Sequence, residues 1–306
     1  AMVKELREMT GAGMMDCKKA LNETNGNMDE AVEFLRKNGQ AKAEKKASRI
    51  AAEGLCMVVT KDDQTAAVVE VNSETDFVAK NATFQEFVKA VATQAVNSDA
   101  ADMDAFMAEK WNEDASKTVS EALVEKVAVI GENLKIRRFE KVVAEHGCVV
   151  PYVHGGGRIG VIVDADTDVV NDTVKEAMHN IAMQIAALNP KYVSRDEVSA
   201  DYIAHEKEIL LAQIMNDPKE SQKPEKVING MIEGRISKEL KEVCLVDQVY
   251  VKAEDGKQTV AKYLEEVSKA VGGTVKVKRF VRFETGEGLE KKQEDFAAEV
   301  AAQMNA

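Results

Sequence analysis

Residues 66–78 read Ala66-Ala67-Val68-Val69-Glu70-Val71-Asn72-Ser73-Glu74-Thr75-Asp76-Phe77-Val78, and this stretch indicates how the chain folds around it. Its first six residues are mostly small or β-branched, which predicts a buried strand. From Thr83 onward, apolar residues recur at helical spacing, which predicts an amphipathic helix. Asp76 and Phe77 are therefore expected side by side at a strand-to-helix corner.

A phenylalanine at such a corner requires an explanation. A Phe side chain left in water forgoes roughly 1.5–3 kcal/mol of burial. Two interpretations are open from spacing alone. Phe77 becomes buried in a partner molecule, or it folds back as a local plug under its own helix.

The strand-and-helix pattern occurs twice. β-Branched strands are predicted at Ala66–Val71 and Gly160–Val163, and the helices that follow have the capping patterns Thr83-x-x-Glu86 and Thr173-x-x-Glu176. The apolar stripes share one spacing, in Phe84, Phe87, Val88, Val91, Ala92 and Ala95 and in Val174, Ala177, Met178, Ile181, Ala182 and Ile185. Thr75-Asp76-Phe77-Val78 is matched by Thr167-Asp168-Val169-Val170, which lacks the aromatic residue. A shared fold therefore does not explain Phe77, which favours contact with a partner.

The N-terminal residues predict three short helices. The first runs from Val3 to Met9, the second from Met14 to Thr24, and the third begins at the cap Asn27 and stops at Gly39. The basic run from Arg36 to Ile50 is interpreted as a solvated helical linker. Its alternative role is electrostatic guidance towards an acidic partner.

The second half of the chain predicts an inserted helical hairpin. Its arms, Ser199 to Met215 and Glu225 to Glu242, are separated by corners that contain Pro218 and Pro224. Further elements are a strand at Val243–Val251, a helix at Val260–Val271, a strand at Val275–Phe283, a flexible joint at Gly286–Gly288 and a last helix from Lys291 to Met304. Residues 98–118 follow no recognisable pattern.

Composition narrows the class of protein. The 306 residues are 45% hydrophobic and 31% charged, which is typical of a globular protein. The net charge of -12 argues against nucleic acid as the main partner, and no apolar run approaches the ~20 residues of a membrane span. The four cysteines form no C-x-x-C pair, which favours free thiols in a reducing cytoplasm.

No catalytic or metal site is predicted. His146 and Cys148 lack two further ligands for a metal. The glycines of Gly155-Gly156-Gly157-Arg158 precede a strand and lack the phosphate-binding G-x-x-x-x-G-K-[ST] pattern, so we interpret them as a tight turn. We expect no cofactor, and we do not expect the chain to be a GTPase itself.

The chain contains five long, specific motifs: Leu6-Arg7-Glu8-Met9-Thr10-Gly11-Ala12-Gly13-Met14-Met15-Asp16-Cys17-Lys18-Lys19-Ala20-Leu21, residues 70–80, Ile130-Gly131-Glu132-Asn133, residues 152–161 and Arg282-Phe283-Glu284-Thr285-Gly286-Glu287-Gly288. Together they resemble the bacterial elongation factor Ts family. The resemblance spans nearly the whole chain. It implies a cytoplasmic, non-enzymatic guanine-nucleotide exchange factor that binds elongation factor Tu in translation elongation and promotes GDP release.

The resemblance also implies which residues bind the partner. Asp76 and Phe77 would insert between helices of elongation factor Tu near its Mg²⁺ site, and Thr75 and Val78 would shape this tip. Met14, Met15 and Lys18 would dock the N-terminal helices, although a place in the small core is the alternative for at least one of the two methionines. Ile130, Gly131 and His154 match further interface positions.

The predicted fold class is α+β. A three-helix, ubiquitin-associated-like domain (1–40) and a basic helical linker (41–54) precede two duplicated subdomains, each an antiparallel sheet with helices (55–148 and 149–286). The helical hairpin is inserted at about 199–242, and a C-terminal helical module occupies 287–306.

Two other functions compete with nucleotide exchange. One is a binding or chaperone module that holds clients with the N-terminal domain, and the other is an enzyme that uses the Gly-rich turn with His154. Measuring GDP release from elongation factor Tu separates the first from an exchange factor, and turnover without any GTPase would indicate the second. We expect at most weak self-association through the hairpin.

Overall fold

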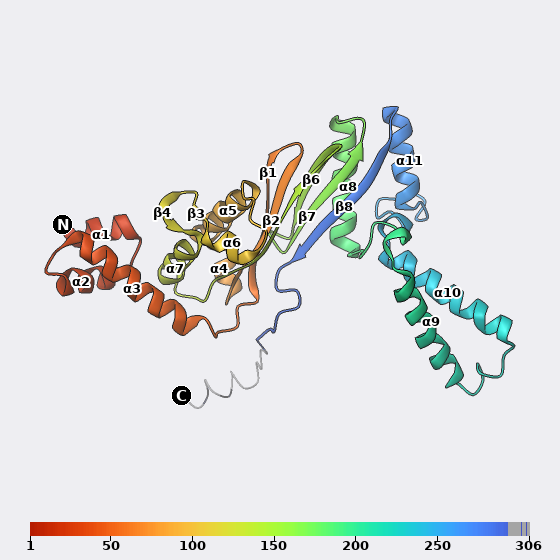
Figure 1. Ribbon diagram of the computed structural model, residues 1–306, viewed down its shortest axis with the longest axis horizontal. Coiled ribbons are helices and arrows are strands. Elements are labelled where there is room, and N and C mark those ends of the chain that lie inside the picture. Colours follow the sequence, from red (N-terminus) through yellow and green to blue (C-terminus); the bar gives the residue numbers. More distant parts are fainter. Residues whose placement is uncertain (293–300, 302–303, 305–306) are drawn as a thin grey trace.

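Two antiparallel three-stranded sheets, packed face to face, form the centre of the computed structural model, which describes residues 1–292, 301 and 304 (Figure 1). The first sheet has the order β1 (Glu53–Asp62), β2 (Thr65–Ser73), β5 (Lys135–Val143), and the second β6 (Gly147–His154), β7 (Ile159–Thr167), β8 (Val275–Glu284). A core that includes Cys56, Val68, Ile162 and Phe283 lies between them. Every residue of β2 is buried, because this central strand is covered on both faces.

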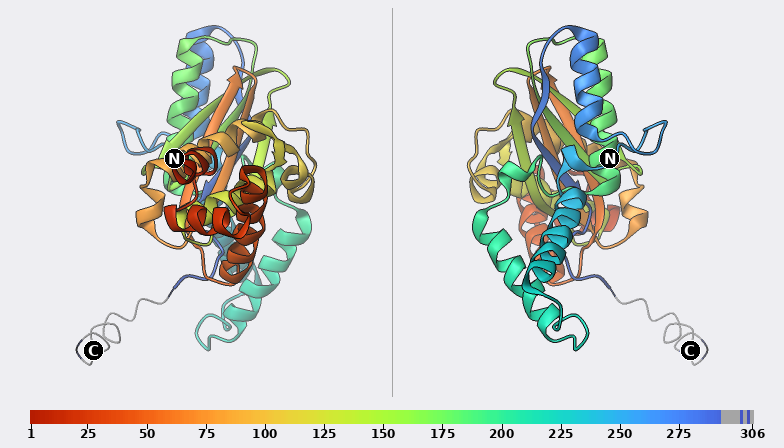
Figure 2. Two further views of the ribbon diagram at one scale, coloured as in Figure 1. Left: turned by 90° about the vertical axis from the view of Figure 1, so that its left-hand side faces the viewer. Right: turned by 90° about the vertical axis from the view of Figure 1, so that its right-hand side faces the viewer.

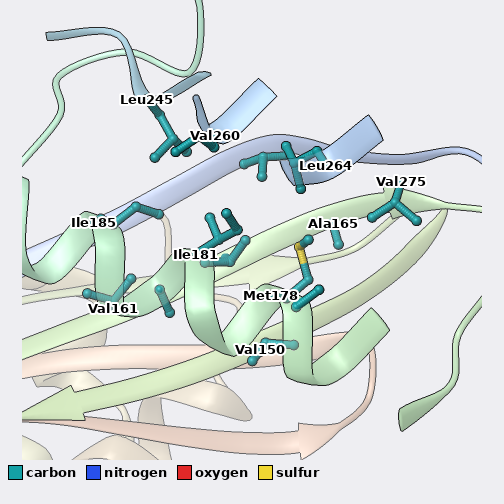
Figure 3. Packing of buried hydrophobic residues seen from close by; sticks show 14 of the residues in the cluster. Val150, Val161, Ala165, Met178, Ile181, Ile185, Leu245, Val260, Leu264 and Val275 are labelled. Carbon is teal, nitrogen blue, oxygen red and sulfur yellow. The ribbon is translucent and has the colours of Figure 1, made fainter. Parts of the chain in front are cut away.

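Helices cover the two outer faces and complete four layers. α5 (Ala82–Val96) packs on the first sheet, and α7 (Val119–Ile130) shares its core. α8 (Asp172–Leu188) packs on the second sheet, with α11 (Val260–Val271) beside it. Figure 3 shows Met178, Ile181 and Ile185 of α8 among the buried side chains of this second core. The α+β class is thereby confirmed.

The two sheets repeat each other in detail. Each has a β-bulge in its third strand, opposite Glu70/Val71 of β2 and opposite Asp164/Ala165 of β7, and in each sheet the carboxylate before the bulge pairs with an arginine of the third strand. The predicted helix caps at Thr83 and Thr173 are wrong by two residues. The side chains of Asn81 and Asn171 accept the capping hydrogen bonds, since their short amides reach the free N–H groups at the start of each helix.

The N-terminal helices α1 (Met2–Thr10), α2 (Met14–Glu23) and α3 (Met28–Lys46) surround a small core that contains Leu6, Cys17 and Leu21. The prediction that Gly39 ends the third helix is wrong, because α3 continues to Lys46. Gly39 is buried where α3 meets α7, and a Cβ there would lie 3.7 Å from Ala128. Tertiary packing thus outweighs the low helix propensity of glycine. The basic segment is helical only as far as Lys46.

Residues 98–118, for which the sequence pattern predicts no secondary structure, cover one side of the first core. They form α6 (Met103–Ala108) and the small hairpin β3 (Lys110–Trp111) and β4 (Asp114–Thr118). Phe106 and Trp111 are buried in the core under α5. Aromatic burial therefore determines the conformation of this stretch.

The predicted helical hairpin is confirmed as α9 (Ala200–Met215) and α10 (Glu225–Val243). It projects from one end of the molecule, and the N-terminal helices lie at the other (Figures 1 and 2). The predicted strand at Val243–Val251 is wrong. This segment contains a 3₁₀ turn, η2 (Leu245–Asp247), and only isolated bridges, because Leu245 and Tyr250 turn into the second core. A further 3₁₀ turn, η1 (Arg195–Glu197), precedes α9.

The turn after β8 is anchored, so the predicted flexible joint at Gly286–Gly288 is wrong. The Gly286 amide donates a 2.7 Å hydrogen bond to the buried carboxylate of Glu70. Most of the predicted last helix, Lys291 to Met304, and of the predicted module 287–306 lies outside the described residues. Among the described helices, none is both long and apolar enough to cross a membrane.

Candidate functional site

The Asp-Phe corner is a single helical turn, α4 (Asp76–Ala79), at the end of β2. Thr75 caps this turn, because its hydroxyl accepts a hydrogen bond from the Val78 amide at 3.3 Å. Ala79 is buried and Val78 half-buried, so one face of the turn rests on the first core. The Phe77 side chain points away from that core and is 79% exposed. Such exposure excludes the local plug. We call Thr75–Val78 the tip.

Asp76, next to Phe77 in the sequence, carries an ionised carboxylate. Its Oδ2 lies 2.8 Å from Nζ of Lys80, one turn along the chain. The hydrogen bond from Lys80 holds the pKa of the Asp76 carboxyl below its usual range. The tip therefore presents an apolar ring next to an anionic oxygen.

The tip is an insertion in the first copy of the repeat. Gly54 and Gly147 face the carbonyls of Val71 and Ala165 in the same way, which makes Ser73 and Thr167 equivalent. Seven residues separate Ser73 from the helix cap Asn81, whereas three separate Thr167 from Asn171. The four residues of α4 have no counterpart. The sequence match of Thr75–Val78 with Thr167–Val170 is therefore wrong, and the second copy lacks the whole turn.

Ile130 and Gly131 lie at the end of α7, beside the base of the tip. Gly131 ends the helix with a φ of +87°, a conformation that favours glycine, and the chain turns towards β5. The next residue, Glu132, accepts a hydrogen bond from the Thr75 hydroxyl at 2.7 Å. The structure thus brings this predicted position into the same corner as the tip.

Met14, Met15 and Lys18 share α2. Met14 is 59% exposed and Met15 75% exposed, while Cys17 and Leu21 form the core side of the helix. The expectation that at least one methionine belongs to the small core is wrong. Lys18 is exposed as well, so the three residues form an accessible surface.

His154 ends β6, just before the Gly-rich turn. Its Nδ1 lies 2.8 Å from the hydroxyl of Tyr152, and the imidazole is exposed. The turn is confirmed, since Gly155, Gly156 and Gly157 all have positive φ between β6 and β7. Within residues 1–292, no hydrogen bond or ion pair joins His154 or the two methionines to the tip.

Comparison with known proteins identifies the family. A family description, Elongation factor TS, matches residues 74–287. The chain is 53% identical to elongation factor Ts of Clostridioides difficile (strain 630) over 304 residues, which cover 99% of this chain and 97% of that protein. It is 51% identical to elongation factor Ts of Clostridium novyi (strain NT) over 305 residues, which cover 99% and 98%.

The chain belongs to the elongation factor Ts family.

Two carboxylates in this elongation factor Ts family member have structural roles that the sequence pattern does not predict. Glu132 contacts the tip, and Glu70 anchors the turn after β8. A signal for Glu132 exists in the repeat, because the loop after α11 reads Gly272-Gly273-Thr274 where the loop after α7 reads Gly131-Glu132-Asn133. Glu70 is matched in the repeat by Asp164 of β7, but one charge in an apolar strand does not reveal that its partners include the Gly286 amide.

No metal-binding group of three or more His, Cys, Asp or Glu side chains occurs in the part of the chain that is described. His146 pairs with Asp166 and Asp168 at 2.8 and 3.1 Å. All four cysteines are buried and free, and burial raises the pKa of the Cys56 thiol to about 12. This thiol is therefore protonated near neutral pH.

Proposed function

We propose that this protein is a guanine-nucleotide exchange factor that binds elongation factor Tu and promotes release of GDP, without catalysing a chemical reaction. The observation that carries the proposal is the exposure of Phe77 on an inserted helical turn. An apolar ring presented in this way suits insertion into another protein, because burial in the complex recovers the hydrophobic free energy forgone in the free factor.

The tip would act by displacing the helices that support the nucleotide site of the GTPase. Mg²⁺ requires near-octahedral geometry with ligands at ~2.0–2.1 Å, so a small displacement weakens its hold on the phosphates. Phe77 would supply the apolar insertion, and Asp76 a directed charge or hydrogen-bond contact. Since coupling between two binding sites is reciprocal, nucleotide would expel the factor to the same degree.

Other surfaces would add binding free energy without displacing the helices that support the nucleotide site. The exposed Met14 and Met15, with Lys18, would dock the N-terminal helices, because flexible thioethers adapt to a partner surface. Ile130, Gly131 and His154 would contact the partner around the tip. In this arrangement the tip drives release and the remaining surfaces hold the complex together.

The first test is release of a fluorescent GDP analogue from elongation factor Tu by wild type and by Phe77→Ala. Loss of the inserted ring is expected to slow release about ten- to hundredfold, while binding to nucleotide-free elongation factor Tu largely persists. Val143→Ala is a matched control, because it also removes an exposed apolar side chain, at 50% exposure, and lies at the end of β5 opposite to the tip. Normal exchange by Phe77→Ala would contradict the role of the tip, and no acceleration by wild type would contradict the function.

A further inference from the structure

Glu132 binds the base of the tip through both oxygens of its carboxylate. Oε2 accepts hydrogen bonds from the backbone amides of Glu74 and Thr75 at 3.0 and 3.1 Å. Oε1 accepts a hydrogen bond from the Thr75 hydroxyl at 2.7 Å. The same hydroxyl caps α4, so one half-buried side chain controls the residues from which the helical turn starts.

Glu74, next to the tip, in turn contacts the loop after α7. Oε1 of Glu74 accepts a 2.7 Å hydrogen bond from the Asn133 amide, next to Glu132. The Asn133 side chain donates to the carbonyl of Arg49, whose guanidinium lies 3.4 Å from Glu74. The loop after α7, the tip and the segment that follows α3 are therefore joined in one hydrogen-bonded corner.

The second half of the molecule shows what the fold requires at this place. α11 ends at Gly272 with a φ of +69°, as α7 ends at Gly131, and both helices lead into the third strand of a sheet. In the second half, Gly273 stands at the position equivalent to Glu132, and no residues correspond to α4. Two departures from the repeat thus occur at one corner, and they are hydrogen-bonded to each other. The second half adopts the same fold without a carboxylate at this position, so the fold does not require Glu132, and its contacts in the first half are made to the base of the tip.

We propose that Glu132 is a positioning residue that holds the Asp76-Phe77 tip in the conformation in which it enters the partner. The inference rests on the proposed exchange function and deepens it. A helix of four residues is far below the length at which helices are stable alone, so α4 depends on contacts at its ends. A tip ordered before binding avoids the entropy cost of ordering in the complex.

The test measures GDP release from elongation factor Tu with Glu132→Ala, Glu132→Gln, Phe77→Ala and the double variant Glu132→Ala/Phe77→Ala. We expect Glu132→Ala to slow release about tenfold, because three donors lose a charged acceptor. Glu132→Gln should recover most of the rate, since its carbonyl still accepts from the backbone and its amide can donate to Thr75. Glu113→Ala, an exposed glutamate in the β3–β4 turn, is the matched control and should exchange as wild type.

The double variant distinguishes positioning from general damage. If Glu132 acts through the tip, Glu132→Ala/Phe77→Ala is no slower than the slower single variant, because coupled residues are not additive. Hydrogen exchange at the Glu74 and Thr75 amides should also rise in Glu132→Ala, while thermal unfolding remains a single cooperative transition.

Three outcomes would overturn the inference while leaving the exchange function intact. They are normal release by Glu132→Ala beside a slow Phe77→Ala, multiplied effects in the double variant, and unchanged amide exchange at Glu74 and Thr75. Normal release by Phe77→Ala would instead overturn the proposed action of the tip, and the positioning role with it.

Discussion

At the scale of single residues, the most consequential side chain outside the tip is the carboxylate of Glu70. It is fully buried, yet it accepts hydrogen bonds from Asn72, Arg137, Arg138 and Gly286 at 2.7–3.3 Å. A buried charge is tolerated only when it is paired and hydrogen-bonded in this way. Glu70 therefore holds the turn after β8 against the first sheet.

Glu70→Ala is expected to lower the free energy of unfolding by about 3–5 kcal/mol, because it leaves two arginines without their buried partner. Urea denaturation measures the loss. Glu140→Ala, which removes an exposed carboxylate from β5, serves as the control and should change stability by no more than about 0.5 kcal/mol. A loss of under about 1 kcal/mol for Glu70→Ala would show that the pair behaves like a surface ion pair.

At the scale of elements, close contact between α3 and α7 attaches the N-terminal helices to the rest of the molecule. Gly39 lies at this contact, within a helix that its presence should weaken. The small residue permits the approach of the two helices. It follows that the orientation of α2, which presents Met14 and Met15, depends on this packing.

Gly39→Ala is expected to stabilise α3 by about 0.5–1 kcal/mol, since a Cβ there would meet Ala128 at an ordinary contact distance of 3.7 Å. Gly39→Leu, by contrast, should cost about 1–3 kcal/mol, because the larger side chain separates α3 from α7. Thermal unfolding followed by circular dichroism distinguishes the two. Equal effects of Ala and Leu would mean that the α3–α7 contact is not closely packed.

At the scale of the whole molecule, the two halves of the repeat share one core. The cluster between the sheets contains residues of both, including Val68 and Phe283, and Ile162 lies fully buried in it. Neither sheet keeps this face covered without the other. We therefore expect the two halves to unfold together.

Ile162→Ala should lower stability by about 2–5 kcal/mol and Ile162→Val by about 0.5–1.5 kcal/mol. The single tryptophan, Trp111, lies in the first core, whereas Ile162 belongs to the second sheet. Denaturation followed by Trp111 fluorescence should nevertheless report the full loss. Ile236→Ala, in the separate core of the helical hairpin, is the control and should leave the Trp111 transition in place. An unmoved transition in Ile162→Ala would show that the halves unfold independently.

The features that depend on local pattern can be predicted from the order of the residues. Apolar spacing predicted α5, α8, α11 and both hairpin helices, the repeat predicted two related sheets, and the corner motif located the tip. These predictions succeed because hydrophobic periodicity and the conformational limits of proline and glycine act over a few neighbouring residues.

The features that depend on residues far apart in the chain become visible only in the folded molecule. Glu132 and Thr75 are 57 positions apart, and Glu70 and Gly286 are 216 apart. The register of the antiparallel strands brings the first pair together, and the turn after β8 the second. The same physics explains the errors, since Gly39 stays helical and Val243–Val251 does not form a strand because of what packs against them. Local propensities amount to about 1 kcal/mol per residue, and burial against a distant partner exceeds them.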